Sequence, residues 1–184
     1  MLRHLLPLVL FAATALAAGS SPPALAAADD LPVGKVTKLP VPRYASLKTD
    51  RVNLREGPSK DHRTAWIFQR AGLPVEITAE FEVWRRIRDS AGTEGWVLHS
   101  LLSGRRTALV MPWAKAGSEP LALRERPDDG GAVVAQLQQN VIANVKKCET
   151  GWCRVIVPIP GARDISGYMK QDRLWGVYPN EKVD

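Results

Sequence analysis

The chain has 184 residues, of which 45% are hydrophobic and 24% are charged, and its formal net charge is +6. This composition is typical of a globular protein and argues against an intrinsically disordered one. The positive charge favours binding to acidic surfaces but carries no information about the fold.

Residues 1–28 have the pattern of a cleavable signal peptide. Arg3 and His4 form a basic start, Leu5–Leu16 is almost wholly apolar, and small residues through Ala28 fit a cleavage site. The apolar run is short for a membrane span, so we expect no stable membrane insertion; an uncleaved N-terminal anchor is the alternative. The sequence therefore predicts a periplasmic or secreted protein, and export argues against a nucleic-acid partner.

Residues 29–43 are rich in proline and are expected to form an extended or disordered lead-in. The next segment, 44–106, is expected to be a first domain. Short runs between turn residues predict strands over 51–54, 66–68, 74–78, 81–88 and 95–98, and a single helical turn over 99–102. No stretch has a long 3.6-residue apolar period, so the fold class is predicted to be all-β.

Residues 107–118 are expected to connect the first domain to a second one over 119–179. Leu109, Val110, Met111 and Trp113 make this connector apolar. We therefore expect the two domains to pack through it, with Trp113 between them.

The second domain repeats the landmarks of the first in the same order. The matches are Val52–Pro58 with Leu121–Pro127, Trp84–Ile87 with Trp152–Val155, Gly95–Val97 with Gly167–Met169, and Leu102–Gly104 with Leu174–Gly176. The offsets are 69, 68, 72 and 72 residues, and loop insertions account for the variation. The chain is therefore predicted to hold two copies of one small fold. Trp66 has no aromatic counterpart in the second copy, where Val133–Val134 lies roughly in register.

Cys148 and Cys153 are the only cysteines, and an oxidising compartment favours a disulfide between them. The bridge would close a short loop, so its contribution should fall at the low end of about 2–4 kcal/mol. A redox-active pair is the alternative, although four intervening residues differ from the two of a thioredoxin-type motif.

The first copy resembles the bacterial SH3-like domain family. The resemblance rests on Asn53–Pro58, Val83–Ile87 and Gly95–Val97. The second copy is looser, because Arg126 stands in place of Gly57 and Tyr168 in place of Trp96. The resemblance implies two tandem small SH3-like β-barrels, and binding to cell-wall material or protein partners.

Five residues of the first copy are the candidate ligand contacts. They are Trp66, Trp84, Arg86, Arg88 and Trp96. The aromatic residues either cap the core or line a groove for a proline- or glycine-rich peptide. The arginines either form a solvated strand face or recognise an anion such as a stem-peptide carboxylate of peptidoglycan.

The mature chain has two histidines, His62 and His99, and neither lies in a catalytic or metal-binding motif. We therefore expect no catalytic residues, no metal site and no cofactor. The predicted function is that of a non-catalytic exported binding protein whose partner is cell-wall peptidoglycan or an envelope protein. The alternatives are a scaffold or accessory subunit that docks one protein partner, and a minor cell-wall hydrolase.

Overall fold

The computed structural model describes residues 32–183, so the predicted signal peptide lies outside the described residues. Within this range every extended element is a β-strand and the helices are short 3-10 turns, which confirms the all-β prediction. None of the helices described there has the length and apolarity that a membrane crossing requires.

The first sheet contains seven strands in the order β3-β2-β6-β5-β4-β1-β7. Their bounds are β1 (Arg43–Leu47), β2 (Val52–Arg55), β3 (Thr64–Phe68), β4 (Pro74–Phe81), β5 (Trp84–Arg88), β6 (Glu94–Leu98) and β7 (Leu102–Ser103). The 3-10 helix η2 (His99–Leu101) joins β6 to β7. We call residues 43–103 the first barrel.

The second sheet also contains seven strands, in the order β10-β9-β13-β12-β11-β8-β14. Their bounds are β8 (Thr107–Val110), β9 (Leu121–Arg124), β10 (Val133–Leu137), β11 (Ile142–Glu149), β12 (Trp152–Val157), β13 (Ile165–Lys170) and β14 (Leu174–Trp175). Helix η3 (Gln171–Arg173) joins β13 to β14. We call residues 107–175 the second barrel.

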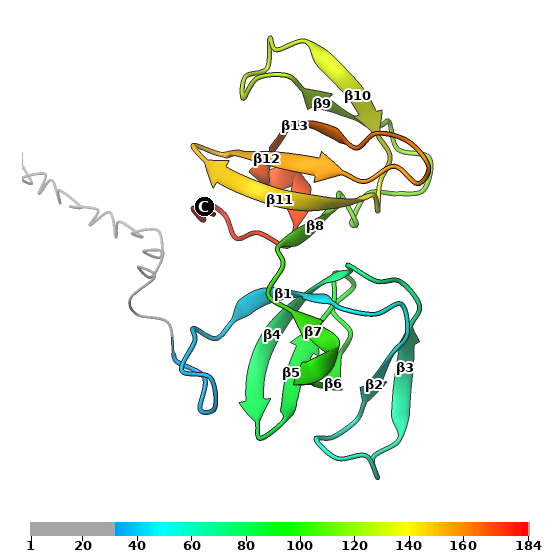
Figure 1. Cartoon of the computed structure of the whole chain (residues 1–184), viewed down its shortest axis with the longest axis vertical. Helices are drawn as coiled ribbons and strands as arrows, with labels where there is room; N and C mark the ends of the chain where they lie inside the picture. Colours follow the sequence, from blue (N-terminus) through cyan, green and yellow to red (C-terminus); the bar gives the residue numbers. More distant parts are fainter. Residues whose placement is uncertain (1–31, 184) are drawn as a thin grey trace, which may run out of the picture. The chain divides into compact units, whose positions relative to one another are not determined.

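The two sheets have the same strand order when each strand is replaced by its counterpart, β1 by β8 through β7 by β14 (Figure 1). The register agrees as well, because Arg55 lies opposite Trp96 and Arg124 lies opposite Tyr168. The internal repeat of the sequence is therefore a repeat of the whole topology. Each copy has its own hydrophobic core, centred on Leu54 and Ile87 in the first barrel and on Leu123 and Val155 in the second.

Gly95 and Gly167 recur because the neighbouring strand leaves no room for a side chain. A Cβ atom at Gly95 would lie 2.6 Å from Leu54 Cγ, and one at Gly167 would lie 2.7 Å from Arg124 O. These distances are well below van der Waals contact. Close approach of β2 to β6, and of β9 to β13, thus explains one landmark of the repeat.

The predicted strand over 81–88 is interrupted, which corrects the sequence analysis. Phe81 and Trp84 are paired across a tight turn, and Glu82 in that turn has a φ of 45°. The turn makes β4 and β5 the two arms of a hairpin. The run Phe81-Glu82-Val83 has no glycine or proline, so the sequence offered no turn signal there.

The start of the predicted connector, 107–118, is a strand in the structure. Residues 107–110 form β8, which pairs with both β11 and β14 of the second barrel. Strand β8 has no counterpart among the sequence landmarks, so the repeat could not reveal it. The polypeptide that links the two barrels consequently consists of residues 104–106. Hydrogen bonds also join the barrels, from Thr107 Oγ1 to Gly72 O (2.8 Å) and from Arg70 Nη1 to Asn140 O (2.8 Å).

The described part of the lead-in is folded rather than free. Val33 pairs with Pro40, and the turn between them binds the carboxylate of Glu80, whose side chain is fully buried. The N–H groups of Val36 and Thr37 each donate to Glu80 Oε2 over 2.9 Å, and the Thr37 hydroxyl donates to Oε1 over 2.6 Å. This carboxylate therefore anchors the lead-in to β4.

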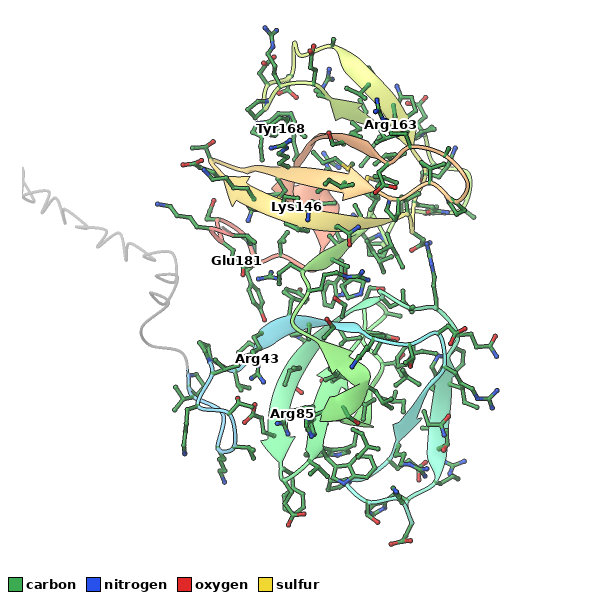
Figure 2. All side chains as sticks on the ribbon, viewed as in Figure 1. Arg43, Arg85, Lys146, Arg163, Tyr168 and Glu181 are labelled. Carbon is green, nitrogen blue, oxygen red and sulfur yellow. A yellow bond between two sulfur atoms is a disulfide. The ribbon has the colours of Figure 1, made fainter. Side chains whose placement is uncertain are left out.

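Two arginines complete the surroundings of Glu80 (Figure 2). Arg43 Nη2 lies 2.7 Å and Arg85 Nε 3.6 Å from Glu80 Oε1. Burial raises the pKa of Glu80, but the hydrogen bonds from Thr37, Arg43 and Val36 outweigh it and hold the pKa at about 2.

Cys148 and Cys153 form the predicted disulfide, across the hairpin of β11 and β12. Both residues are buried. Cys148 also exchanges two backbone hydrogen bonds with Val183, 2.9 and 3.3 Å long. The bridge therefore fixes the strand that holds the C-terminal segment.

Replacing both cysteines with alanine should lower the free energy of unfolding by about 2 kcal/mol, as expected for closure of a short loop. Urea unfolding of the wild-type protein and of C148A/C153A measures the difference. Equal stability of the two proteins would show that the bridge does not constrain the unfolded chain.

Glu80→Gln should lower the free energy of unfolding at pH 7 by about 2–4 kcal/mol, because it leaves the buried Arg85 and the partly buried Arg43 without their carboxylate. The wild-type carboxylate has a folded pKa of about 2 and an ordinary value of 4.5. Its contribution is therefore complete above pH 4.5 and is lost as the pH falls towards 2.

Urea unfolding of E80Q and wild type between pH 2 and 7 tests this dependence. Glu56→Gln is the matched control, since Glu56 pairs with Arg63 on the surface. E56Q should leave stability at pH 7 almost unchanged. A pH profile of E80Q as steep as that of the wild type would contradict the assignment.

Candidate binding site

The second barrel carries a hollow of about 580 Å³ that five aromatic residues help to line, and we call it the aromatic hollow. It is lined by Tyr44, Trp113, Gly151, Trp152, Lys170, Gln171, Asp172, Leu174, Trp175, Val177, Tyr178, Pro179 and Asn180. Most of these residues lie at one end of the second sheet or in the segment that follows β14. Tyr44 is contributed by β1 of the first barrel.

Trp152 is positioned by the hairpin that precedes it. Thr150 and Gly151 turn the chain with φ values of 49° and 79°, and Trp152 then opens β12 opposite Glu149. Lys170 Nζ lies 5.7 Å from the centre of the Trp152 ring, within range of a cation–π contact. The same ammonium group is 2.8 Å from Asp129, so this wall of the hollow is neutral overall.

Tyr44, Trp175 and Tyr178 form a packed aromatic group. The Tyr44 ring centre is 4.6 Å from that of Tyr178 and 5.4 Å from that of Trp175, with an edge-on angle of 83° to Trp175. Among residues 32–183, the Nε1 atom of Trp175 is buried and has no hydrogen-bond partner. Trp175, a lining residue of the hollow, thus carries an indole N–H whose hydrogen bond is unmade.

The Tyr178 hydroxyl donates a 2.9 Å hydrogen bond to Glu76 Oε1 of the first barrel. Glu76 is buried, and Arg88 Nε donates to its other oxygen over 2.8 Å. Burial, followed by the neighbouring Glu76, raises the pKa of Tyr178 far above its usual value, so the hydroxyl keeps its proton. Burial and the neighbouring Glu76 also raise the pKa of Tyr44.

The C-terminal segment after β14 is held by a second set of contacts. Glu181 accepts hydrogen bonds from both terminal nitrogens of Arg106, at 2.7 and 3.0 Å, and from the N–H of Tyr178 at 2.8 Å. Gln171 Nε2 donates to the carbonyl oxygens of Tyr178 and Glu181. Figure 2 labels Glu181 on this segment. Tyr178 and Pro179 of the same segment line the hollow.

Trp113 is an exposed aromatic residue in the lining of the hollow. It follows Met111, which turns the chain at the end of β8 with a φ of 37°, and its side chain is 55% exposed. Trp113 was expected between the domains. It lines the hollow together with Tyr44 of the first barrel, and more than half of its surface is accessible to solvent. Flat rings with nearby polar groups suit a peptide or a sugar ring that stacks on them.

None of the five residues predicted from the sequence lines the aromatic hollow. Trp84 is buried, as a core cap would be, and lines a smaller pocket of the first barrel. Arg88 is paired with Glu76, and Arg86 with Glu94 at 2.6 Å. Ile87 between them is fully buried, so the two arginines share the outer face as predicted.

Trp96 and Trp66 lie on different strands. Trp96 is half-buried on β6, with Arg55 and Arg86 as its cross-strand neighbours. Trp66 is 57% exposed on β3, an outer strand of the sheet. Its counterpart by register is Ala135, not Val133–Val134, because Trp66 pairs with Leu54 and Ala135 with Leu123.

The site residues predicted from the sequence did not include Tyr44, Lys170, Trp175 and Tyr178. Tyr44 and Tyr178 lie at the outer ends of the two repeats, beyond the shared landmarks. A sequence signal did exist, because Trp175 and Tyr178 are aromatic where the first copy has Ser103 and Arg106. Residues peculiar to one copy are the ones that the common fold does not require.

Residues 32–183 contain no group of three or more side chains suited to holding a metal ion. Both cysteines in that range are joined in the disulfide.

The family comparison agrees with the repeat. A family model described as the bacterial SH3 domain matches residues 48–104 and again 117–176. These two matches cover more than half of the chain, which therefore belongs to the bacterial SH3 domain family. No curated protein matches it.

Solved structures similar to the chain include two proteins of Trichomonas vaginalis, NlpC2 and NlpC1. Each is 14% identical to it, with TM-scores of 0.33 and 0.32. The alignments cover 73% and 77% of this chain and 48% of each of the two proteins. The chain thus spans about half the length of these structures.

Tyr178→Phe should lower the free energy of unfolding by about 1–3 kcal/mol, because Glu76 loses a hydrogen bond to a buried carboxylate oxygen. Tyr168→Phe is the control, since the Tyr168 hydroxyl makes no hydrogen bond to any residue within 32–183. Denaturant unfolding of the two variants gives the comparison. Equal effects of the two substitutions would mean that the Tyr178–Glu76 bond contributes no net stability.

Proposed function

Because the chain is a tandem bacterial SH3 protein, we propose that it is an exported, non-catalytic binding protein that recognises cell-wall peptidoglycan. The observation that carries the proposal is the aromatic hollow. Three tryptophans and two tyrosines line a space large enough for several residues of a peptide or for sugar rings.

The proposed location rests on two independent features. Residues 1–28 have the sequence of a signal peptide, and the chain carries a disulfide between its only two cysteines. Disulfides persist in oxidising compartments such as the bacterial periplasm. The proposed lack of catalysis rests on the sequence, in which no nucleophile, base or metal-ligand motif occurs.

Trp113→Ala should weaken sedimentation with purified peptidoglycan by about 10-fold or more, because exposed aromatic anchors contribute strongly to binding. Trp66→Ala is the matched control. The two tryptophans are 55% and 57% exposed, but Trp66 lies on β3, outside the hollow. Saturable binding of the wild type that W113A loses and W66A keeps supports the proposal. The absence of wild-type binding at low salt rejects peptidoglycan as the ligand.

Docking of an envelope protein is the second candidate, and exposed apolar residues on two outer strands favour it. Trp66 and Ile67 on β3, and Val133 and Val134 on β10, are all at least 37% exposed. An outer strand with exposed apolar side chains can pair with a strand of a partner. In that case W66A, not W113A, should abolish capture of the partner from an envelope extract. A lysis band on cell-wall zymography would instead favour the hydrolase alternative.

A further inference from the structure

The first barrel has a second, smaller hollow of about 220 Å³, which we call the basic pocket. It is lined by Arg51, Asn53, Arg55, Lys60, Trp84, Leu98 and Leu101. Three of these residues are cationic and none is acidic. This pocket therefore differs from the aromatic hollow, where Lys170 is balanced by acidic neighbours.

The cations of the basic pocket are not neutralised by the protein. Within residues 32–183, neither Arg51 nor Lys60 is paired with a carboxylate. Arg55 Nη1 donates to Lys60 O at 3.0 Å and to His62 O at 2.7 Å, which ties the loop carrying Lys60 to β2. The loop is thereby fixed with Lys60 among the residues that line the pocket.

Asn53 supplies the complementary group. Its Oδ1 atom is buried and accepts no hydrogen bond within the described chain. Arg51 directly precedes β2, and Asn53 and Arg55 lie on it, alternating with the buried Val52 and Leu54. Their side chains therefore share a face and are spaced about 7 Å apart. A buried acceptor without a partner destabilises the protein, and a ligand with an N–H group could supply the missing hydrogen bond.

The remaining wall is apolar. Trp84 pairs with Leu98 across β5 and β6, and Trp84 is only 6% exposed. Leu101 of η2 completes this wall. A ligand that fits the pocket thus needs a negative charge, an N–H donor close to it and a short alkyl group.

We propose that the basic pocket binds the carboxyl-terminal end of a peptide. Arg51 and Lys60 receive the terminal carboxylate, Asn53 Oδ1 accepts the amide N–H of the last residue, and Trp84 and Leu98 contact its side chain. The proposal rests on the proposed function for the source of the peptide, since cell-wall stem peptides end in free carboxylates. A protein C-terminus has the same chemistry in L-configuration.

The second barrel shows which members of the pocket the fold requires. It keeps Arg124 and Trp152 in the places of Arg55 and Trp84. By the 69-residue offset of the repeat, Pro120 stands for Arg51, Ala122 for Asn53 and Asp129 for Lys60. The groups assigned to the ligand are therefore those that the second copy lacks, and binding is confined to the first barrel.

Titration of the ¹⁵N-labelled protein with N-acetyl-D-alanyl-D-alanine, its L,L isomer and the C-terminal amides of both tests the assignment. Either free acid should shift the Asn53 side-chain amide and the Trp84 indole signals. The matching amide should bind at least 10-fold more weakly, since it has lost the charge. Preference for the D,D acid indicates a wall peptide, and preference for the L,L acid a protein C-terminus.

The variants N53A and K60D copy the second barrel, so the fold should tolerate both, and each should weaken binding of the free acid by about 10-fold. Lys146→Ala, an exposed lysine on β11 of the second barrel that lines neither hollow, is the control and should leave the affinity unchanged. Equal affinity for acid and amide, or full binding by N53A and K60D, would overturn the proposal.

Failure of this inference can be told apart from failure of the proposed function. Peptide binding at Asn53 without sedimentation on peptidoglycan would reject the proposed function and keep the basic pocket. Sedimentation that depends on Trp113, with no dipeptide binding, would reject the basic pocket and keep the proposed function.

Discussion

The buried carboxylate of Glu76 is the contact on which the relation of the two barrels depends. Arg88 donates to one of its oxygens from within the first barrel, and Tyr178 donates to the other from the segment that follows the second. A carboxylate that is removed from water must have partners on its oxygens, because the cost of burying it is otherwise several kcal/mol. Tyr178 is therefore needed beside Glu76 as a hydrogen-bond donor. Its ring packs against Tyr44, which holds the C-terminal segment there.

The aromatic hollow follows from this contact. Tyr44 and Tyr178 are wall residues of the hollow as well as members of the group around Glu76. Arg106 supports the same group, since it binds Glu181 and lies 5.9 Å from the Tyr44 ring centre. The proposed binding site and the contacts between the two barrels thus share residues.

The sequence predicted the repeated parts of the structure and missed the parts that each copy has alone. Alternation at Val52 and Leu54, the close-packed Gly95 and the turn residues of the hairpins are local signals, and they recur 68 to 72 residues later. Strand β8 and the turn at Glu82 lack such signals, because tertiary pairing alone defines them. The aromatic hollow joins Tyr44 to Tyr178, which no local pattern links. The arginines at 86 and 88 looked available because the acids that pair with them lie on other strands.

Residues 104–106, the short span between β7 and β8, determine how the protein can engage a polymer. Three residues reach only about 10 Å when extended, and here Arg105 O accepts a hydrogen bond from Ser46 while Arg106 is bound to Glu181. The two barrels therefore differ from domains that a flexible linker connects. A polymer that occupied the basic pocket and the aromatic hollow together would meet them at a preset spacing. The second contact would then be gained as avidity, with little further loss of conformational entropy, and only chains of matching repeat length would receive it.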